Sequence, residues 1–138
     1  MVERVESDVF SILEKDGIVA NNLFSANKEI SNLFDILKET PESSWSHRVI
    51  DSDSNSATLI CQSPGEGNRE HYHKDWNEWW FILKGEWEWT IEGKTHIVKE
   101  GDFVFIEKGK KHKITACGDT PAIRLAVSRG DVGHVYTD

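Results

Sequence analysis

Two histidines stand one residue apart at His71 and His73, Glu78 follows five positions later, and His112 lies further along the chain. Side chains two positions apart on a strand point to the same face, so both imidazoles can reach one point in space. The odd offset of Glu78 would put it on the opposite face, but the polar, turn-like segment 74–77 can reset the register. Three imidazoles and one carboxylate suit a divalent transition metal. These four residues are therefore our candidate metal ligands.

Short runs rich in β-branched and aromatic residues fill the chain after Pro41, and turn residues separate them. Their alternation has the period of two that half-buried strands show. The runs that we interpret as strands cover residues 46–51, 57–62, 70–73, 78–83, 86–92, 95–99, 102–107, 112–116 and 122–128. Nine short strands with no helix between them indicate an antiparallel sandwich or barrel, because a βαβ fold would need intervening helices.

Two of these strands and one turn would place the later ligands. Glu78 begins the strand 78–83. The side chains that share its face are Trp80 and Ile82, and those on the opposite face are Trp79, Phe81 and Leu83. His112 follows the tight turn 108–111, which lets the chain swing its side chain back toward the mouth of a barrel.

The first 41 residues have a helical pattern instead. Apolar residues recur at helical spacing in two stripes, Val2, Val5, Val9 and Leu13, then Ile30, Leu33, Phe34 and Leu37. We predict helices over residues 3–15 and 25–39, with Pro41 ending the second. The chain then divides into an N-terminal helical extension, residues 1–41, and a β-barrel domain, residues 42–138.

The balance of charges limits the partners. The sequence has 24 acidic and 16 basic residues, a formal net charge of −8, which argues against nucleic acid and against anionic membrane surfaces. No apolar stretch approaches the roughly 20 residues of a membrane-spanning helix, and the first ten residues have no signal-peptide pattern. We expect a cytoplasmic protein in which Cys61 and Cys117 are free thiols.

The glycines, histidines and glutamate of the strand-rich part resemble the paired motifs of the cupin superfamily, in its small single-domain form. The matching positions are Gly65, His71, His73, Glu78 and Gly85, then Gly101, Gly109 and His112. This resemblance implies a double-stranded β-helix, a small jelly-roll barrel, with one divalent metal held inside by the matching His, His, Glu and His. The sequence departs from the motif at Glu107, where proline is usual, and at Ala116, where asparagine is usual.

Three further side chains are candidates for contact with a substrate. Trp80 shares the face of Glu78 and lines the pocket in one interpretation, or packs in the barrel core in the other. Glu107 would add a carboxylate near the site. Arg124 either points into the barrel to bind an anionic substrate or is solvated, and we expect the solvated position. His47, His96 and His134 follow no such pattern and receive no function.

The resemblance implies several activities, because dioxygenases, isomerases, epimerases, lyases and binding proteins share this fold and this site. We expect a small metalloenzyme, an Fe(II) dioxygenase of a small organic substrate, with Mn(II), Zn(II) or Ni(II) as alternative metals. The competing hypotheses are a binding or sensing module without catalysis, a metal-dependent isomerase or lyase, and a barrel that the metal merely stabilises. We also expect a homodimer, because an exposed face formed by Trp79, Phe81 and Leu83 is costly unless the N-terminal helices or a second subunit cover it.

Overall fold

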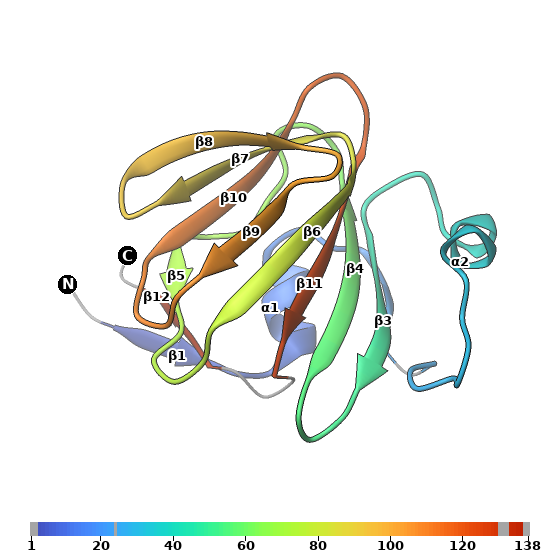
Figure 1. The fold of residues 1–138 in the computed structure, drawn as a ribbon, viewed down its shortest axis with the longest axis horizontal. Helices are drawn as coiled ribbons and strands as arrows, with labels where there is room; N and C mark the ends of the chain where they lie inside the picture. The colour runs from blue at the N-terminus through green and yellow to red at the C-terminus, as the bar shows by residue number, and fades with distance from the viewer. Residues whose placement is uncertain (1–2, 24, 130–132, 137–138) are drawn as a thin grey trace.

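Two six-stranded sheets face each other and enclose the interior of a barrel (Figure 1). The computed structural model describes residues 3–23, 25–129 and 133–136. One sheet has the order β1 (Arg4–Glu6), β12 (His134–Tyr136), β5 (His71–Tyr72), β10 (His112–Cys117), β7 (Glu86–Ile91) and β8 (Lys94–Lys99). The other has the order β2 (Ala20–Asn22), β3 (Trp45–Asp51), β4 (Ser56–Gln62), β11 (Ala122–Ser128), β6 (Glu78–Lys84) and β9 (Phe103–Ile106). The helices are α1 (Val9–Lys15) and α2 (Leu33–Glu39).

All nine strands predicted after Pro41 are present, with ends that differ by at most two residues. The predicted all-β barrel with two short helices is thereby confirmed. Antiparallel pairing dominates, and the parallel pair of β2 with β3 is the exception within the described residues. Neither helix in this part of the chain has the length and apolarity needed to cross a membrane.

The barrel interior is filled by side chains that alternate inward along the strands. In β6, Glu78, Trp80 and Ile82 are buried, as their shared face predicts. The apolar core joins both sheets through Trp80, Ile82, Trp87, Trp89, Val104, Ile106, Ile114, Ala116 and Ala122. Burying a large apolar side chain contributes about 1.5–3 kcal/mol, so this cluster is the main source of stability in the barrel. Trp87 and Trp89 of β7 are fully buried in this core.

The predicted helix over residues 3–15 is wrong in its first half. Residues Arg4–Glu6 form β1, which pairs antiparallel with β12, and the helix begins only at Val9. The spacing of Val5 and Val9 fits a helix equally well, but pairing with a distant strand satisfies the backbone of residues 4–6 and decides their structure. The two ends of the chain are therefore joined in one sheet, next to β5, which carries His71.

The second helix is also shorter than predicted, because it covers Leu33–Glu39 and not residues 25–39. Asn32 caps it by accepting hydrogen bonds from the backbone of Phe34 and Asp35. Before it, Asn27 has a left-handed backbone and hydrogen bonds to Val49 and Asp51 of β3, which holds this segment out of a helix. Ile30 and Phe34 of the predicted stripe are exposed.

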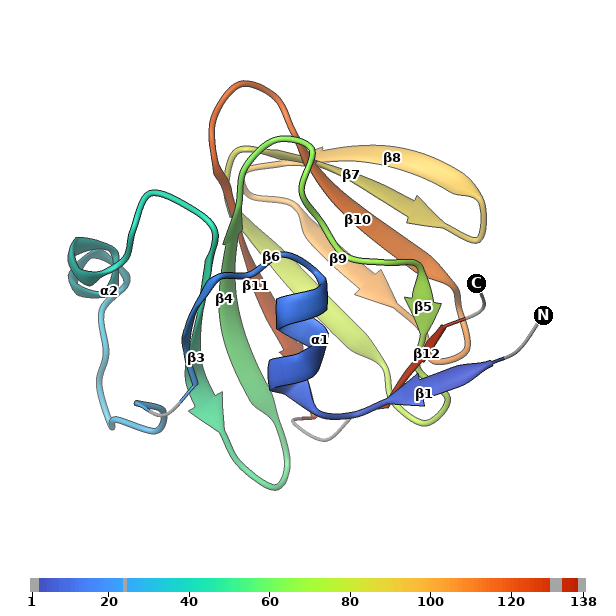
Figure 2. The same cartoon turned by 180° about the vertical axis from the view of Figure 1, so that it is seen from behind.

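The two helices cover different parts of the barrel. Seen from behind, α1 lies between the β3–β4 side and the β5–β12 side, where Leu13 joins the apolar cluster of Ile60 (Figure 2). The α2 helix packs Leu33, Ile36 and Leu37 on the outer face of the sheet that contains β3, β4 and β11. The cluster that it contacts there is Trp45, Leu59, Cys61 and Ile123. The first helix thus closes the end of the barrel that holds the candidate ligands.

Candidate metal centre

The fold brings the four candidate ligands together inside the barrel. His71 lies on β5, His73 just after it, Glu78 at the start of β6 and His112 at the start of β10. All four side chains are buried, and one ligand atom from each lies within 4.8 Å of the others. His71 and His112 are direct partners across the sheet, which fixes the distance between their strands. The group forms a buried site of three imidazoles and one carboxylate that can hold a metal ion.

Each of the three imidazoles is oriented by a backbone carbonyl behind it. The Nδ1 atoms lie 2.8 Å from the carbonyl oxygen of Arg69 for His71, 2.9 Å from that of Gly133 for His73, and 3.1 Å from that of Lys110 for His112. A carbonyl can only accept, so Nδ1 carries the hydrogen in each ring. This leaves the Nε2 lone pairs as the ligand atoms, the arrangement that metal-binding histidines usually have.

Several polar atoms at the centre of this group have no hydrogen-bond partner. They are Nε2 of His73, Nε2 of His112 and Oε1 of Glu78, all fully buried. Nε2 of His73 lies 2.8 Å from Oε1 of Glu78, but the contact lacks hydrogen-bond geometry. Unpartnered buried acceptors are expensive, and a cation between them removes that cost. The residues present therefore fit a divalent metal.

Burial and mutual repulsion set the protonation of the group. Burial, with the neighbouring histidines, lowers the pKa of His71 well below 6.5, and burial also lowers the pKa of His112. At His73 burial acts in the same direction, but the adjacent Glu78 carboxylate outweighs it and raises the pKa. Burial raises the pKa of Glu78, but His73, His112 and His134 together lower it by more, so the net pKa is lowered. Neutral imidazoles beside an ionised carboxylate are the forms that bind metal.

The turn before His112 is held in place despite the absence of proline at position 107. The backbone N–H of Gly109 donates to the carbonyl of His73 at 2.7 Å, and that of Lys108 donates to Oδ1 of Asn77 at 2.9 Å. Gly109 has a φ of 86°, a conformation that glycine adopts without strain. The turn thus ties His112 to the backbone of another ligand. Glu107 itself is exposed and lies outside the buried group.

Trp80 and Arg124 both point into the barrel. The Trp80 ring lies 5.5 Å from the ring of His112 and belongs to the core cluster. The expected solvated position of Arg124 is wrong, because only 3% of this residue is exposed. Its guanidinium donates to Oε1 of Gln62 at 2.7 Å and lies over the Trp87 ring, so the small flanking alanines make room for an inward arginine. Burial lowers the pKa of Arg124 to about 10.

The structure adds one histidine that the sequence did not single out. His134 lies on β12, and its ring centroid is 4.5 Å from those of both His71 and His73. It has no motif spacing, because its position depends on the pairing of β12 with β5 at the far end of the chain. The alternation of His134 with Tyr136 was the one available signal, and it identifies a strand face, not a site.

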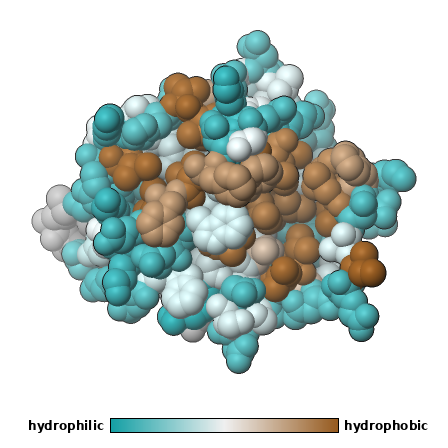
Figure 3. Space-filling model, in the orientation of Figure 1, coloured by the Kyte–Doolittle hydropathy of each residue, from teal (hydrophilic) through white to brown (hydrophobic). Residues whose placement is uncertain are grey.

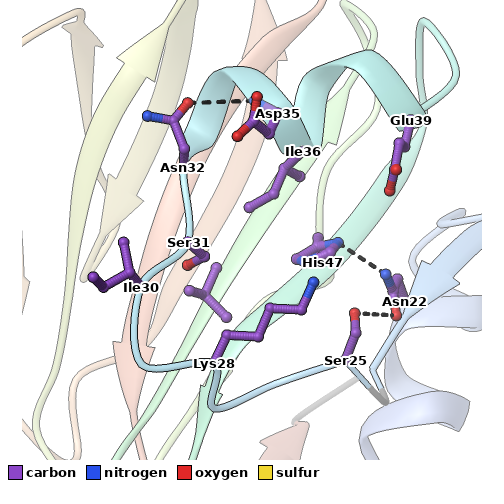
Figure 4. A pocket seen from close by; sticks show the side chains of 11 residues that line it. Asn22, Ser25, Lys28, Ile30, Ser31, Asn32, Asp35, Ile36, Glu39 and His47 are labelled. Carbon is purple, nitrogen blue, oxygen red and sulfur yellow. Dashed lines mark hydrogen bonds between the residues drawn. The ribbon is translucent and has the colours of Figure 1, made fainter.

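Histidine side chains line cavities both inside and outside the barrel. A cavity of about 80 Å³ adjoins the centre and is lined by Glu78 and His134 together with residues of α1, β3, β4 and β11. A larger one, about 380 Å³, lies outside the barrel between the segment before α2 and strand β3 (Figure 4). His47 lines it and hydrogen-bonds to Asn22. None of the four clustered ligands lines this outer cavity.

Known proteins with similar sequences and structures point to one family. Residues 58–128, more than half of the chain, match the Cupin domain family model. The tetracenomycin polyketide synthase protein TcmJ of Streptomyces glaucescens is 27% identical over 81 residues, 55% of this chain and 54% of that protein. Quercetin 2,3-dioxygenase of Bacillus subtilis is 27% identical over 79 residues, 57% of this chain and 23% of that protein. The match thus spans about half of the first relative and a quarter of the second.

A solved structure supports the same assignment at the level of fold. A protein of Klebsiella pneumoniae with a double-stranded β-helix domain superposes with a TM-score of 0.67 at 17% identity, over 81% of this chain and all of that one. The two facing sheets and the family match agree with the motifs around His71 and His112. The chain belongs to the cupin superfamily, as a protein with a cupin type-2 domain.

Proposed function

We propose that this protein is a metal-dependent enzyme that acts on a small organic molecule, with Fe(II) as the metal and a dioxygenase reaction as the activity. The observation that carries the proposal is the set of unpartnered Nε2 and Oε1 atoms of His73, His112 and Glu78, which converge beside a cavity. Three nitrogens and one oxygen suit Fe(II), and Mn(II), Zn(II) or Ni(II) are the alternatives. The similarity to quercetin 2,3-dioxygenase supports the choice of reaction.

The residues of the chain have separate tasks in this proposal. His71, His73, Glu78 and His112 hold the ion, and their backbone hydrogen bonds fix the rings before the ion arrives. When bound, Fe(II) supplies the one-electron chemistry that dioxygen activation needs. Residues Val9, Ile12 and Leu13 of α1 cover the cavity and limit the access of water. An ion held by these four side chains would keep room for a further ligand, and a substrate in the adjoining cavity would be close enough to supply it.

The test begins with metal analysis of protein purified without a metal-affinity tag. The Fe(II)-loaded protein is then exposed to nitric oxide, an O₂ surrogate, and monitored by electron paramagnetic resonance. A high-spin signal that changes when substrate is added supports the proposal. Zinc in the purified protein, together with an iron form that ignores nitric oxide, would replace it with a binding or sensing module, or with a metal-dependent isomerase or lyase.

We further propose that two copies of the chain associate through the outer face of β6 and β9. Trp79, Phe103 and Phe105 are exposed there, and hydrophobic side chains gather on this side of the molecule (Figure 3). Within the described residues β9 pairs only with β6, so it is an edge strand whose free side can meet its own copy around a two-fold axis.

Sedimentation velocity at micromolar concentration should give a dimer, and Phe105→Ser should shift it to monomer. A monomer in the unaltered protein would contradict the association.

A further inference from the structure

The cavity beside the metal centre is lined by chemically different groups. Glu78 of β6 and His134 line it, and so do Arg48 of β3 and Thr58 of β4; in the sheet, β4 and β11 separate β3 from β6. The volume is about 80 Å³, well below the roughly 300–1,000 Å³ of sites for drug-sized ligands. Its occupant must therefore be small.

Arg48 is a buried cation with incomplete partners. Its side chain is 9% exposed, and its only hydrogen bond within the described residues runs from Nε to Oγ1 of Thr58 at 3.1 Å. The carboxylate of Asp51 is 3.8 Å from one terminal nitrogen, too far for a hydrogen bond, and is itself half exposed. Burial lowers the pKa of Arg48. A guanidinium has five donors, so this one retains donors for a ligand.

The charge around the cavity is positive within an acidic protein. The lining has the guanidinium groups of Arg48 and of Arg129, the latter also over the ring of Trp76, against the single carboxylate of Glu78. That carboxylate faces His73 and His112 and is a candidate ligand, so it does not neutralise Arg48. The protein as a whole has a net charge of −8. An inward positive charge against that background favours an anionic occupant.

The remaining wall is mainly apolar. Val9, Ile12 and Leu13 of α1 and Ile60 and Ala126 of the barrel line it, beside the hydroxyl groups of Ser56 and Ser128. Such a wall offers few partners for a highly polar ligand such as a sugar or a nucleotide, but it accommodates a short hydrocarbon group. The cavity lining thus combines the guanidinium of Arg48, mainly apolar side chains and the candidate metal ligand Glu78.

We propose that the ligand of this cavity is a small organic acid whose carboxylate binds Arg48 and whose short apolar body lies under α1, with its far end at Glu78 and the histidines. Arginine is suited to this task because its planar fork can bind a carboxylate through two hydrogen bonds. The proposal rests on the proposed function only for the role of the far end. The carboxylate site itself is complete without a metal.

The test uses isobutyrate as the probe and isobutyramide as its uncharged isostere. Binding is followed by NMR on the full chain, through the amide signals of residues 9–13 and of Thr58, with and without metal. Isobutyrate should shift these signals saturably, and isobutyramide should bind at least tenfold more weakly. Arg48→Gln should weaken isobutyrate binding by roughly tenfold or more, since it removes charge-assisted hydrogen bonds, while metal content stays unchanged. Equal binding of the amide, or unchanged affinity in Arg48→Gln, overturns the proposal.

Two more variants keep the result interpretable. Lys94→Gln removes one positive charge at an exposed site on β8 and should leave isobutyrate affinity unchanged. Ala126→Leu keeps Arg48 but fills the cavity, so it should abolish binding even if Arg48→Gln proves too unstable to measure; retained affinity in Ala126→Leu overturns the proposal. Failure of the proposed enzyme function can be distinguished from failure of the carboxylate site. If the protein takes up no metal but still binds isobutyrate in a way that depends on Arg48, the carboxylate site stands and only the enzyme proposal is refuted.

Discussion

The outer cavity beside β3 and the cavity in the barrel both contain histidine and carboxylate side chains, and they differ in how those groups are satisfied. In the outer cavity, His47 hydrogen-bonds to Asn22, and Asp35 and Glu39 lie on the exposed helix α2. In the barrel, the rings of His73 and His112 are fixed by carbonyls at Nδ1, whereas their Nε2 atoms have no partner. The outer cavity is larger, about 380 Å³ against about 80 Å³.

The comparison teaches that size and residue type are poor guides to a site. The site in the barrel is distinguished by buried lone pairs on Nε2 of His73 and His112 that point toward one another, while Nδ1 of each ring is already hydrogen-bonded. Such an arrangement costs folding free energy, and a cation bound between the lone pairs would offset that cost. Around the outer cavity, by contrast, hydrogen bonds among Asn22, Ser25 and His47 already satisfy these side chains.

The largest expected difference is between removing two candidate metal ligands in the barrel and removing the histidine of the outer cavity. His71→Ala/His73→Ala should lower metal affinity by more than about 100-fold, since changes behind a ligand already cost 10–100-fold. His47→Ala should leave metal content unchanged, and His96→Ala, on the exposed face of β8, is a second control. The measurement is metal stoichiometry after dialysis. Stoichiometric metal in the double variant would sink the site.

A core substitution should sharpen the difference between the barrel and the outer segment that contains α2. Trp87→Ala removes a fully buried side chain from the barrel core and should lower the free energy of unfolding by about 3–5 kcal/mol. Phe34→Ala on α2, where the residue is 69% exposed, should change it by no more than about 0.5 kcal/mol. Urea unfolding measures both. Similar losses in the two variants would mean that α2 is as integral as the barrel.

The pH dependence of the metal-free protein should report the buried histidines. Because the pKa values of His71 and His112 are lowered, the unfolded chain binds protons below pH 6.5 that the folded chain does not. Stability should therefore fall as the pH drops below 6.5, by up to about 1.4 kcal/mol per pH unit for each of these histidines. The raised pKa of His73 acts oppositely, adding stability below 6.5 that is lost as pH rises through its folded value.

Urea midpoints between pH 5 and 7 give this slope. His71→Gln should make this slope shallower, because it removes one of the two histidines with a lowered pKa, His71 and His112. His96→Gln should leave the slope unchanged. A slope unaffected by His71→Gln would show that His71 is solvated in the metal-free protein. Metal affinity should fall over the same range, with His73 the first ligand to take up a proton.

The smallest expected effect concerns the cap of α2. Asn32 accepts hydrogen bonds from two backbone N–H groups at the start of this seven-residue helix. Asn32→Ala should cost about 0.5–2 kcal/mol by urea unfolding and leave metal content unchanged. Asn68→Ala would be a useful contrast, because Asn68 accepts from the backbone of Ile114 in the core strand β10. A loss of metal in Asn32→Ala would link the outer segment to the barrel centre.

The barrel could be predicted because its strands carry their own signal. Alternation in β6 and β10 places Trp80 and Ile114 inward regardless of what lies further along the chain. The N-terminal part could not be predicted in the same way. Residues 4–6 are a strand because of β12, and residues 25–31 are irregular because Asn27 bonds to β3, and neither partner is local in sequence.

The candidate site divides along the same line. The grouping of His71, His73, Glu78 and His112 follows from spacing, strand faces and turns, and the structure places them together. The inward position of Arg124 and the approach of His134 depend on packing in three dimensions: Gln62 must offer its oxygen to the arginine, and β12 must dock beside β5. Neither the contact between Gln62 and Arg124 nor the pairing of β12 with β5 can be predicted from short-range sequence patterns.

The pairing of β1 with β12 has a consequence for how the protein is made. Residues 4–6 meet residues 134–136, and the carbonyl that orients His73 belongs to Gly133. Contacts between such distant segments form late, since the closure entropy of the whole chain opposes them. On the ribosome the ring of His73 can be fixed by Gly133 only after that part of the chain has emerged. Metal uptake during synthesis would then follow the docking of β12.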